Sequence, residues 1–181
     1  DTTATSKADT PVLTPNQNGV VESITKTLSS FATHLLDGVT GSGKTAVYIE
    51  CIRRVIETGQ QALVLVPEIG LTPQTRSRFE AALGVEVPVI HSGISDSERG
   101  RAWAMARSGT ARVILGTRSS VFCSFKSLGL IVVDEEHDGS LKQQDHPRYS
   151  ARDVAVKRGQ VYNCPVILGT ATPSLETLAN A

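Results

Sequence analysis

The sequence predicts an α/β fold, a three-layer sandwich in which helices cover both faces of a mostly parallel sheet. Several short segments are apolar at nearly every position, as in residues 61–67, QALVLVP, and residues 128–133, LGLIVV. These segments alternate with stretches whose apolar residues recur at helical spacing. Polar residues follow the apolar runs directly, where open parallel sheets bind their ligands.

The first half of the chain alternates between helix and strand signals. A helix begins after Thr14, which can cap it, with Pro15 in its first turn and Val20, Val21 and Ile24 along one side. A strand is expected next at residues 33–39 and a helix at 44–58. A buried strand at 61–67 and a helix at 71–83 follow.

The second half continues this alternation. A strand-like segment is expected at residues 85–92 and a capped helix at 95–109. Two strands follow at 111–117 and 128–133, then a helix at 149–159 and a strand at 164–170. A polar loop precedes the helix at residues 149–159, and another helix is expected to start at Pro173.

The composition is that of one ordinary globular domain. Of the 181 residues, 40% are hydrophobic and 20% are charged, and this length suffices for a core. Eighteen basic side chains balance eighteen acidic ones, so contacts with nucleic acid must come from a few placed groups. Residues 1–10 lack large apolar groups, and we expect residues 1–12 to form a flexible leader and residues 13–181 the folded domain.

The three cysteines, Cys51, Cys123 and Cys164, are scattered singly through apolar surroundings. This spacing predicts neither a disulfide framework nor a zinc site. No apolar run approaches the roughly 20 residues that span a bilayer, and the sequence has no basic-then-apolar secretory pattern. We therefore expect a cytoplasmic protein without a membrane segment.

A glycine-rich segment, GVTGSGKT, fits the phosphate-binding pattern G-x-x-x-x-G-K-[ST]. Glycines let the backbone curl until several N–H groups point at a phosphate. Lys44 can reach the β and γ oxygens, and the Thr45 hydroxyl can bind Mg²⁺. A chance glycine-rich turn is the alternative, but a strand precedes the segment and a helix follows it. The residues expected to hold the nucleotide are Gly38, Gly41, Ser42, Gly43, Lys44 and Thr45.

The run LIVVDEEH ends a predicted strand in acidic residues. With a phosphate loop present, Asp134 is expected to orient Mg²⁺ and Glu135 to polarise the attacking water. A surface acidic turn is the plainer interpretation, but the two segments together indicate a nucleotide hydrolase. A small-molecule kinase would need an acceptor site and a lid.

Three further polar clusters follow apolar runs: PEIGLTPQ at residues 67–74, GTRSSVF at residues 116–122, and GTATPS at residues 169–174. This ordered set resembles the first motor lobe of superfamily-two helicases. Together with HSGISDSERGRAW and VDEEHDGSLKQQDHPRYSARDVA, it is similar to the family of bacterial replication-restart DNA helicases. The resemblance covers residues 13–178, and the segment from DEEH to PRYSARDVA is its most specific part.

The resemblance implies a RecA-like P-loop lobe of an ATP- and Mg²⁺-dependent 3′-to-5′ DNA helicase. Such a helicase unwinds stalled or collapsed forks and starts primosome assembly. The implied partners are single-stranded and forked DNA, a second helicase lobe, the primosome and single-strand-binding proteins. Zinc is implied for the full-length family proteins, but the sequence predicts no zinc site in this chain.

The same resemblance assigns roles to single residues. Gln17 matches a glutamine that reads adenine, although it fits a solvated helix position equally. His137 matches the last residue of the DExH box, which senses the nucleotide state. Thr170 and Thr172 match the segment that couples hydrolysis to lobe movement. The residues implied to bind DNA are Thr72, Gln74, Thr117, Arg118, Ser119, Lys142, Arg148 and Tyr149.

Several of these residues also have a structural interpretation. Thr72 and Ser119 fit helix caps, and Tyr149 either stacks on a base or covers the helix that follows it. The family typically has an aromatic residue where this chain has Leu141. Outside the implied site, Trp103 is expected to pack and His91 to be a hydrogen-bonded structural histidine.

Three other functions are compatible with the phosphate loop. One is a restriction-type DNA translocase, against which the segment KQQDHPRYSARDVA argues. A small-molecule phosphotransferase would have a saturable acceptor pocket and nucleotide binding indifferent to DNA. A scaffold without catalysis would tolerate loss of Lys44, Asp134 or Glu135, and all three are present.

The first prediction concerns the chain alone, which is expected to lack the second motor lobe and its arginine fingers. Because such arginines contribute roughly 10³ to 10⁵ in rate, we expect weak ATP binding and negligible DNA-stimulated hydrolysis. Phosphate release, measured with and without a forked DNA, checks this. Robust stimulation by DNA would contradict it.

Overall fold

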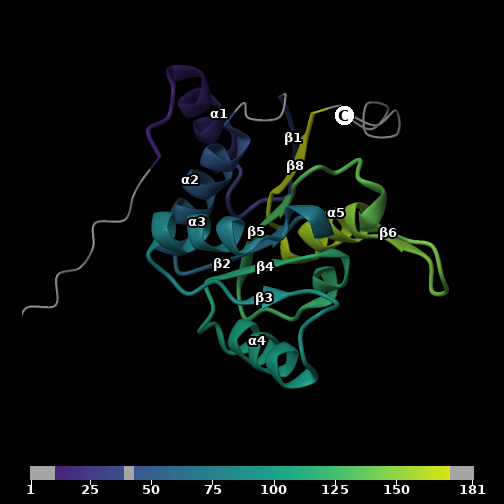
Figure 1. Cartoon of the computed structure of the whole chain (residues 1–181). Coiled ribbons are helices and arrows are strands. Elements are labelled where there is room, and N and C mark those ends of the chain that lie inside the picture. The colour runs from purple at the N-terminus through teal and green to yellow at the C-terminus, as the bar shows by residue number, and fades with distance from the viewer. Residues whose placement is uncertain (1–10, 39–42, 172–181) are drawn as a thin grey trace, which may run out of the picture.

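The computed structural model of the chain describes residues 11–38 and 43–171. The predictions for Gly41, Ser42 and Thr172, for the leader up to residue 10 and for a helix at Pro173 lie outside these ranges. The predicted α/β sandwich is confirmed (Figure 1).

The centre of the fold is a sheet of six strands, and every neighbouring pair in it is parallel. In spatial order the strands are β1 (Thr33–Asp37), β8 (Val166–Thr170), β5 (Leu128–Val133), β2 (Gln61–Leu65), β4 (Val113–Gly116) and β3 (Val89–Ile90). The register aligns Leu65 of β2 with Gly116 of β4 and Val133 of β5, and Val133 in turn with Leu168 of β8. The carboxyl ends of all six strands therefore lie along one side of the sheet, which we call the strand-end edge.

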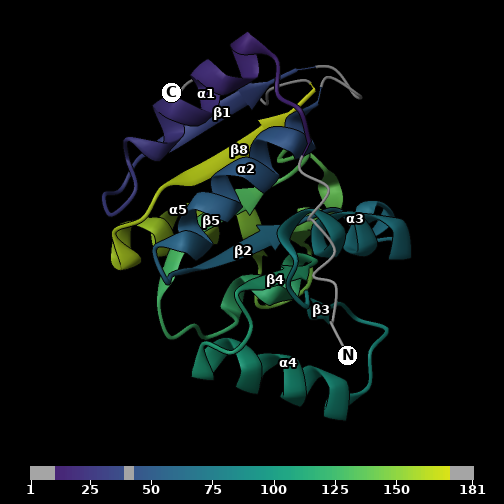
Figure 2. The ribbon, with the colours of Figure 1, turned by 90° about the vertical axis from the view of Figure 1, so that its left-hand side faces the viewer.

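Helices cover both faces of the sheet (Figures 1 and 2). On one face lie α1 (Pro15–Thr25), α2 (Lys44–Glu57) and α3 (Pro73–Leu83), and on the other lie α4 (Asp96–Ser108) and α5 (Ala151–Tyr162). The expected caps are present, because Thr14 and Ser95 each form a capping box and Gly109 ends α4 in the left-handed conformation.

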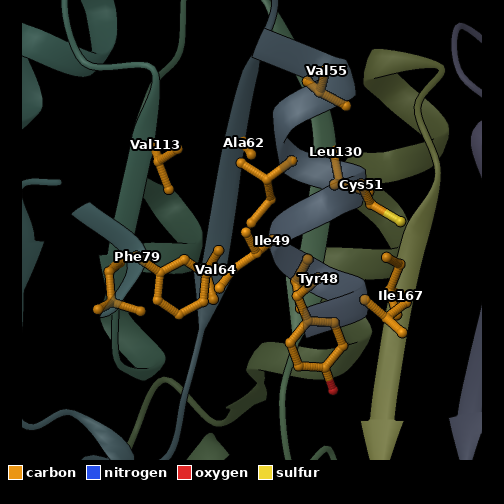
Figure 3. Packing of buried hydrophobic residues seen from close by; sticks show 14 of the residues in the cluster. Tyr48, Ile49, Cys51, Val55, Ala62, Val64, Phe79, Val113, Leu130 and Ile167 are labelled. Atoms are coloured by element: carbon orange, nitrogen blue, oxygen red, sulfur yellow. The ribbon is translucent and has the colours of Figure 1, made fainter. Parts of the chain in front are cut away.

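The core has two halves, because successive side chains of a strand point to opposite faces. Ala62 and Val64 of β2 pack toward α2, whereas Leu63 and Leu65 pack on the opposite face. Figure 3 shows side chains of α2 interleaved with those of the sheet. Strands β2, β4, β5 and β8 are buried on both faces, which explains why they are almost entirely apolar, whereas the edge strand β1 is partly exposed.

The structure refines several predicted boundaries. The strand expected at residues 85–92 is only Val89–Ile90, which follows Pro88. The polar loop contains a 3₁₀ turn, η3 (Gly139–Leu141), and a hairpin of β6 (Lys142–Gln143) and β7 (Tyr149–Ser150). Two more 3₁₀ turns, η1 (Glu68–Gly70) and η2 (Arg118–Phe122), follow β2 and β4.

Two structural predictions for single residues are confirmed. Trp103 packs against the core on the face that α4 covers. His91 accepts a hydrogen bond at Nδ1 from the N–H of Gly93, over 2.9 Å. Within residues 11–38 and 43–171, no helix has the length and apolar character to cross a bilayer.

The second prediction concerns the cysteines, which are free and buried. Burial raises the pKa of Cys51 to about 12, and the pKa values of Cys123 and Cys164 to about 11. A raised pKa keeps the thiol protonated, so at pH 8 we expect no rapid reaction of the folded chain with a chromogenic disulfide. In urea all three thiols should react, since an unfolded cysteine has a pKa of about 8.5. Rapid reaction of any native thiol would contradict the buried placement.

Candidate functional site

The phosphate-loop residues that the structure describes lie at the strand-end edge. The N–H of Gly38 donates to the carbonyl of Thr170 over 3.0 Å, which ties the end of β1 to the end of β8. Gly43 has φ +85° and caps α2, and a Cβ there would lie 2.2 Å from Nε2 of Gln17. The left-handed conformation therefore disfavours a side chain at Gly43, and a side chain there would also displace the amide of Gln17. Lys44 and Thr45 are the first two residues of α2.

Lys44 is held in place by the elements around it. Its side chain is 9% exposed, and Nζ donates to the carbonyl of Gly38. Nζ also lies 3.9 Å from Oε1 of Glu135. The predicted phosphate-binding lysine and the predicted catalytic glutamate are thus ion-paired across the strand-end edge, although 91 residues separate them in sequence.

Gln17 links the start of α1 to the phosphate loop. Its Oε1 accepts the N–H of Thr14 over 2.8 Å, as part of the capping box. Its Nε2 approaches the carbonyl of Gly43 at 3.4 Å. The structure is compatible with both a helix role and an adenine-reading role for Gln17, because the residue caps a helix and also reaches the loop expected to hold ATP.

The acidic segment is anchored by its backbone between two strands. The N–H of Asp134 donates to Leu65 of β2 over 2.8 Å, and that of Glu136 donates to Gly169 of β8 over 2.9 Å. Between them, Glu135 has φ +48°, in the left-handed region that glycine favours. Such strain costs of order 1–3 kcal/mol and concentrates at functional positions.

His137 connects Glu135 to the end of β8. Its Nδ1 shares a hydrogen bond of 2.8 Å with Oγ1 of Thr170, and its Nε2 lies 3.6 Å from Oε2 of Glu135. The structure therefore brings together the predicted state-sensing histidine and one of the two predicted coupling threonines.

Two contacts of the acidic segment were not found by sequence reasoning. Tyr48 of α2 donates a hydrogen bond to Oδ1 of Asp134 over 2.9 Å. Glu136 is buried, and Arg152 of α5 lies 3.3 Å from its Oε2. The signal for Tyr48 was available, since it lies four residues after Lys44 and so on the same face of the helix.

One group of predicted DNA-binding residues lies where β2 and β4 end. Oγ1 of Thr72 accepts the N–H of Thr75 over 3.1 Å, so the helix-capping role of Thr72 is confirmed. Gln74 is exposed, whereas Thr117 is 3% exposed. Ser119 lies inside η2, whose N-terminal cap is Thr117. A cavity of about 150 Å³ at this edge is lined by Glu68, Leu71, His91, Ser92 and Thr117.

The other predicted DNA-binding residues lie on or beside the β6–β7 hairpin. Nη1 of Arg118 donates to the carbonyl of Lys142 over 3.0 Å. The ring of Tyr149 lies edge-on to Phe122, with ring centroids 4.9 Å apart. Arg148 is exposed and donates from Nε to the carbonyl of Gln144 over 3.1 Å. The contacts of Arg118 and Phe122 join the hairpin to η2.

Leu141, the position where an aromatic residue was expected, is buried at 1% exposure. Its side chain packs in the core half that α4 and α5 cover. The chain therefore uses this position for the core.

The oxygen groups at the site suit Mg²⁺. Asp134 offers a carboxylate and Thr45 a hydroxyl, the ligand types that Mg²⁺ takes together with phosphate oxygens and water. In the part of the chain that the structure describes, no three His, Cys, Asp or Glu side chains form a group that could hold a metal by itself.

Comparison with known proteins places these observations in a family. A model of the DEAD/DEAH box helicase family matches residues 14–181. Among solved structures, RecG bound to a three-way DNA junction matches 94% of this chain and 22% of its own, with a TM-score of 0.68 and 24% identity. The UvsW helicase from bacteriophage T4 matches 90% of this chain and 54% of its own, with a TM-score of 0.59 and 16% identity. These two likenesses concern the fold.

Two relatives are much closer in sequence. The chain is 53% identical over 152 residues to the replication restart protein PriA of Haemophilus influenzae, which is 84% of this chain and 21% of that protein. It is 47% identical over 171 residues to PriA of Bacillus subtilis, which is 93% of this chain and 21% of that protein. The chain thus spans about a fifth of the length of these relatives.

The third prediction separates the capping role of Thr72 from any other role. Replacing it with alanine removes the acceptor for the N–H of Thr75, and we expect a loss of about 1 kcal/mol in the free energy of unfolding. Thr72→Ser keeps the oxygen and should retain most of that stability. Urea denaturation of the three proteins checks both expectations. Equal stability of Thr72→Ala and the unsubstituted chain would contradict the capping role.

Proposed function

Because this chain belongs to the DEAD/DEAH box helicase family, we propose that it is the ATP-binding motor lobe of an ATP-dependent 3′-to-5′ DNA helicase. In this proposal the helicase unwinds stalled or collapsed forks and starts primosome assembly for replication restart. The observation that carries the proposal is the ion pair of Lys44 and Glu135 at the strand-end edge, beside Asp134. The similarity to PriA over most of the chain supports the fork-restart role.

Nucleotide binding is assigned to the loop between β1 and α2 and to the first turn of α2. The N-terminal end of α2 and the loop amides attract the phosphates, and Lys44 exchanges the Gly38 carbonyl for phosphate oxygens. Contact with the base is assigned to Gln17, whose Nε2 approaches the carbonyl of Gly43 in this loop. Thr45 and Asp134 would hold Mg²⁺, which supplies positive charge to offset that of the phosphates.

Hydrolysis is assigned to Glu135. Its two carboxylate oxygens face different partners, Oε1 toward Lys44 and Oε2 toward His137, so its orientation is fixed from both sides. A carboxylate held in this way can accept a proton from a water aligned with the terminal phosphate. The left-handed backbone of Glu135 aims the side chain away from the direction that an extended strand would give it.

Coupling of hydrolysis to DNA is assigned to two routes. One runs from Glu135 through His137 to Thr170. The other runs along the chain from Glu136 through η3 to the hairpin, which Arg118 and Phe122 contact. DNA bound at α3, η2 and the hairpin could thus change the position of the acidic segment at both of its ends.

The proposed partners are single-stranded and forked DNA, a second motor lobe, the primosome and single-strand-binding proteins, in the cytoplasm. RecG, which shares the fold, has been solved on a three-way DNA junction. Hydroxyl, amide and guanidinium groups at the strand-end edge suit a phosphate backbone, because they position a strand without reading its sequence. Zinc is assigned only to a full-length protein and not to this chain.

The fourth prediction tests the role of Glu135 in a protein that has the remaining parts of a helicase. This chain replaces the matching segment of Haemophilus influenzae PriA, and the chimera carries Glu135→Gln. The amide keeps the shape of the side chain but accepts protons poorly, so we expect kcat for ATP to fall by about 10²-fold or more. Binding of ATP should persist. Phosphate release with and without forked DNA gives kcat, and a fluorescent nucleotide gives affinity.

Glu57→Gln serves as the matched control, since Glu57 is an exposed glutamate at the far end of α2. Its kcat should equal that of the unsubstituted chimera. An unchanged kcat in Glu135→Gln would remove the assignment of the catalytic base. An equal rate of phosphate release from the unsubstituted chimera with and without forked DNA would count against the motor function.

A further inference from the structure

Tyr48 occupies a position that its neighbours shape closely. It lies one turn after Lys44 in α2, is 1% exposed and belongs to the core cluster beneath that helix. Figure 3 shows its ring packed among Ile49, Val64 and Ile167, with the hydroxyl pointing the way that β8 runs, toward the strand-end edge. The hydroxyl donates to Oδ1 of Asp134 over 2.9 Å.

Gly169 provides the space through which this hydroxyl reaches the carboxylate. A Cβ at Gly169 would lie 1.6 Å from the Tyr48 oxygen and 3.3 Å from Oδ1 of Asp134. The flanking residues of β8, Leu168 and Thr170, both have side chains. The position without a side chain is therefore the one that the Tyr48 hydroxyl approaches. The contact is therefore built by three elements: α2, β5 with its following residue, and β8.

The direction of the hydrogen bond is fixed. Burial, and the negative charge of Asp134 after it, raise the pKa of Tyr48 far above its usual value. The phenol keeps its proton throughout the physiological range and acts as donor to the carboxylate. A phenylalanine would fill nearly the same volume, so packing alone does not require the hydroxyl, whose burial costs free energy unless it is bonded.

We propose that Tyr48 is a positioning residue for Mg²⁺-dependent nucleotide binding. By holding Oδ1 of Asp134, its hydroxyl sets the rotation of the carboxylate that would hold Mg²⁺ when a nucleotide is bound. Groups that hold a metal ligand in this way typically contribute 10- to 100-fold to metal affinity or activity. The inference rests on the proposed function, because it requires Asp134 to serve the metal.

The test is a magnesium titration of the 181-residue chain in the presence of a fluorescent ADP analogue. In Tyr48→Phe, we expect the half-saturating Mg²⁺ concentration to rise about 10-fold or more. Affinity for the same nucleotide in EDTA should stay within about twofold of the unsubstituted value, because the loop and Lys44 are untouched. Tyr162→Phe is the matched control, since Tyr162 lies at the far end of α5 and is 38% exposed.

Gly169→Ala supplies a second variant, because the added methyl group displaces the hydroxyl without removing it. It should shift the magnesium requirement in the same direction as Tyr48→Phe. Thermal unfolding in EDTA shows whether each variant is folded.

Three results would overturn the inference. In the first, Tyr48→Phe has the magnesium requirement of the unsubstituted chain, and the proposed function survives. In the second, Tyr48→Phe loses as much affinity in EDTA as in Mg²⁺, which marks a structural role only. In the third, the unsubstituted chain binds nucleotide equally with and without Mg²⁺, and the proposed function falls as well.

Discussion

The parallel register of the six strands is the constraint on which the site depends. Because the strands run the same way and Leu65, Val133 and Leu168 are aligned, the residues after them emerge at one edge. Asp134 therefore meets Gly169, and Glu135 meets Lys44, across large separations in sequence. A shift of β5 by one residue would turn its side chains to the opposite faces and carry the acidic segment out of reach of α2.

The rigid core carries a set of polar groups that would be costly without partners. Buried Tyr48 is bonded to Asp134, and buried Glu136 is paired with Arg152. In surroundings of low dielectric, such bonds fix side-chain orientation more firmly than they would at an exposed surface. The left-handed conformation of Glu135 is tolerated because Asp134 and Glu136, on either side, are anchored by backbone hydrogen bonds to Leu65 and Gly169.

The fold could be predicted from the sequence because burial on both faces leaves an unmistakable pattern, as in QALVL and LGLIVV. The glycine-rich loop and the DEEH segment can also be recognised in the sequence, from the spacing of their residues. Contacts between elements are harder to predict. The spacing from Lys44 puts Tyr48 on the same face of its helix, but it does not indicate which group the hydroxyl reaches. No pattern in the sequence indicates that Arg152 pairs with Glu136. The hairpin within the polar loop was missed for a similar reason, since its two-residue strands are too short for a periodic signal. The roles of Gln17 and Tyr149 stayed open because each residue makes a structural contact that does not exclude a ligand.

The most direct test of the account is a crystal structure of the chain with Mg²⁺ and a non-hydrolysable ATP analogue. We expect the triphosphate against Gly38 and Gly43, with Nζ of Lys44 at about 2.7–3.2 Å from its β or γ oxygens. Mg²⁺ should lie between the Thr45 hydroxyl and the Asp134 carboxylate, directly or through its water. A triphosphate bound elsewhere, or a Mg²⁺ beyond the reach of Asp134, would contradict the claim that the strand-end edge is the ATP site.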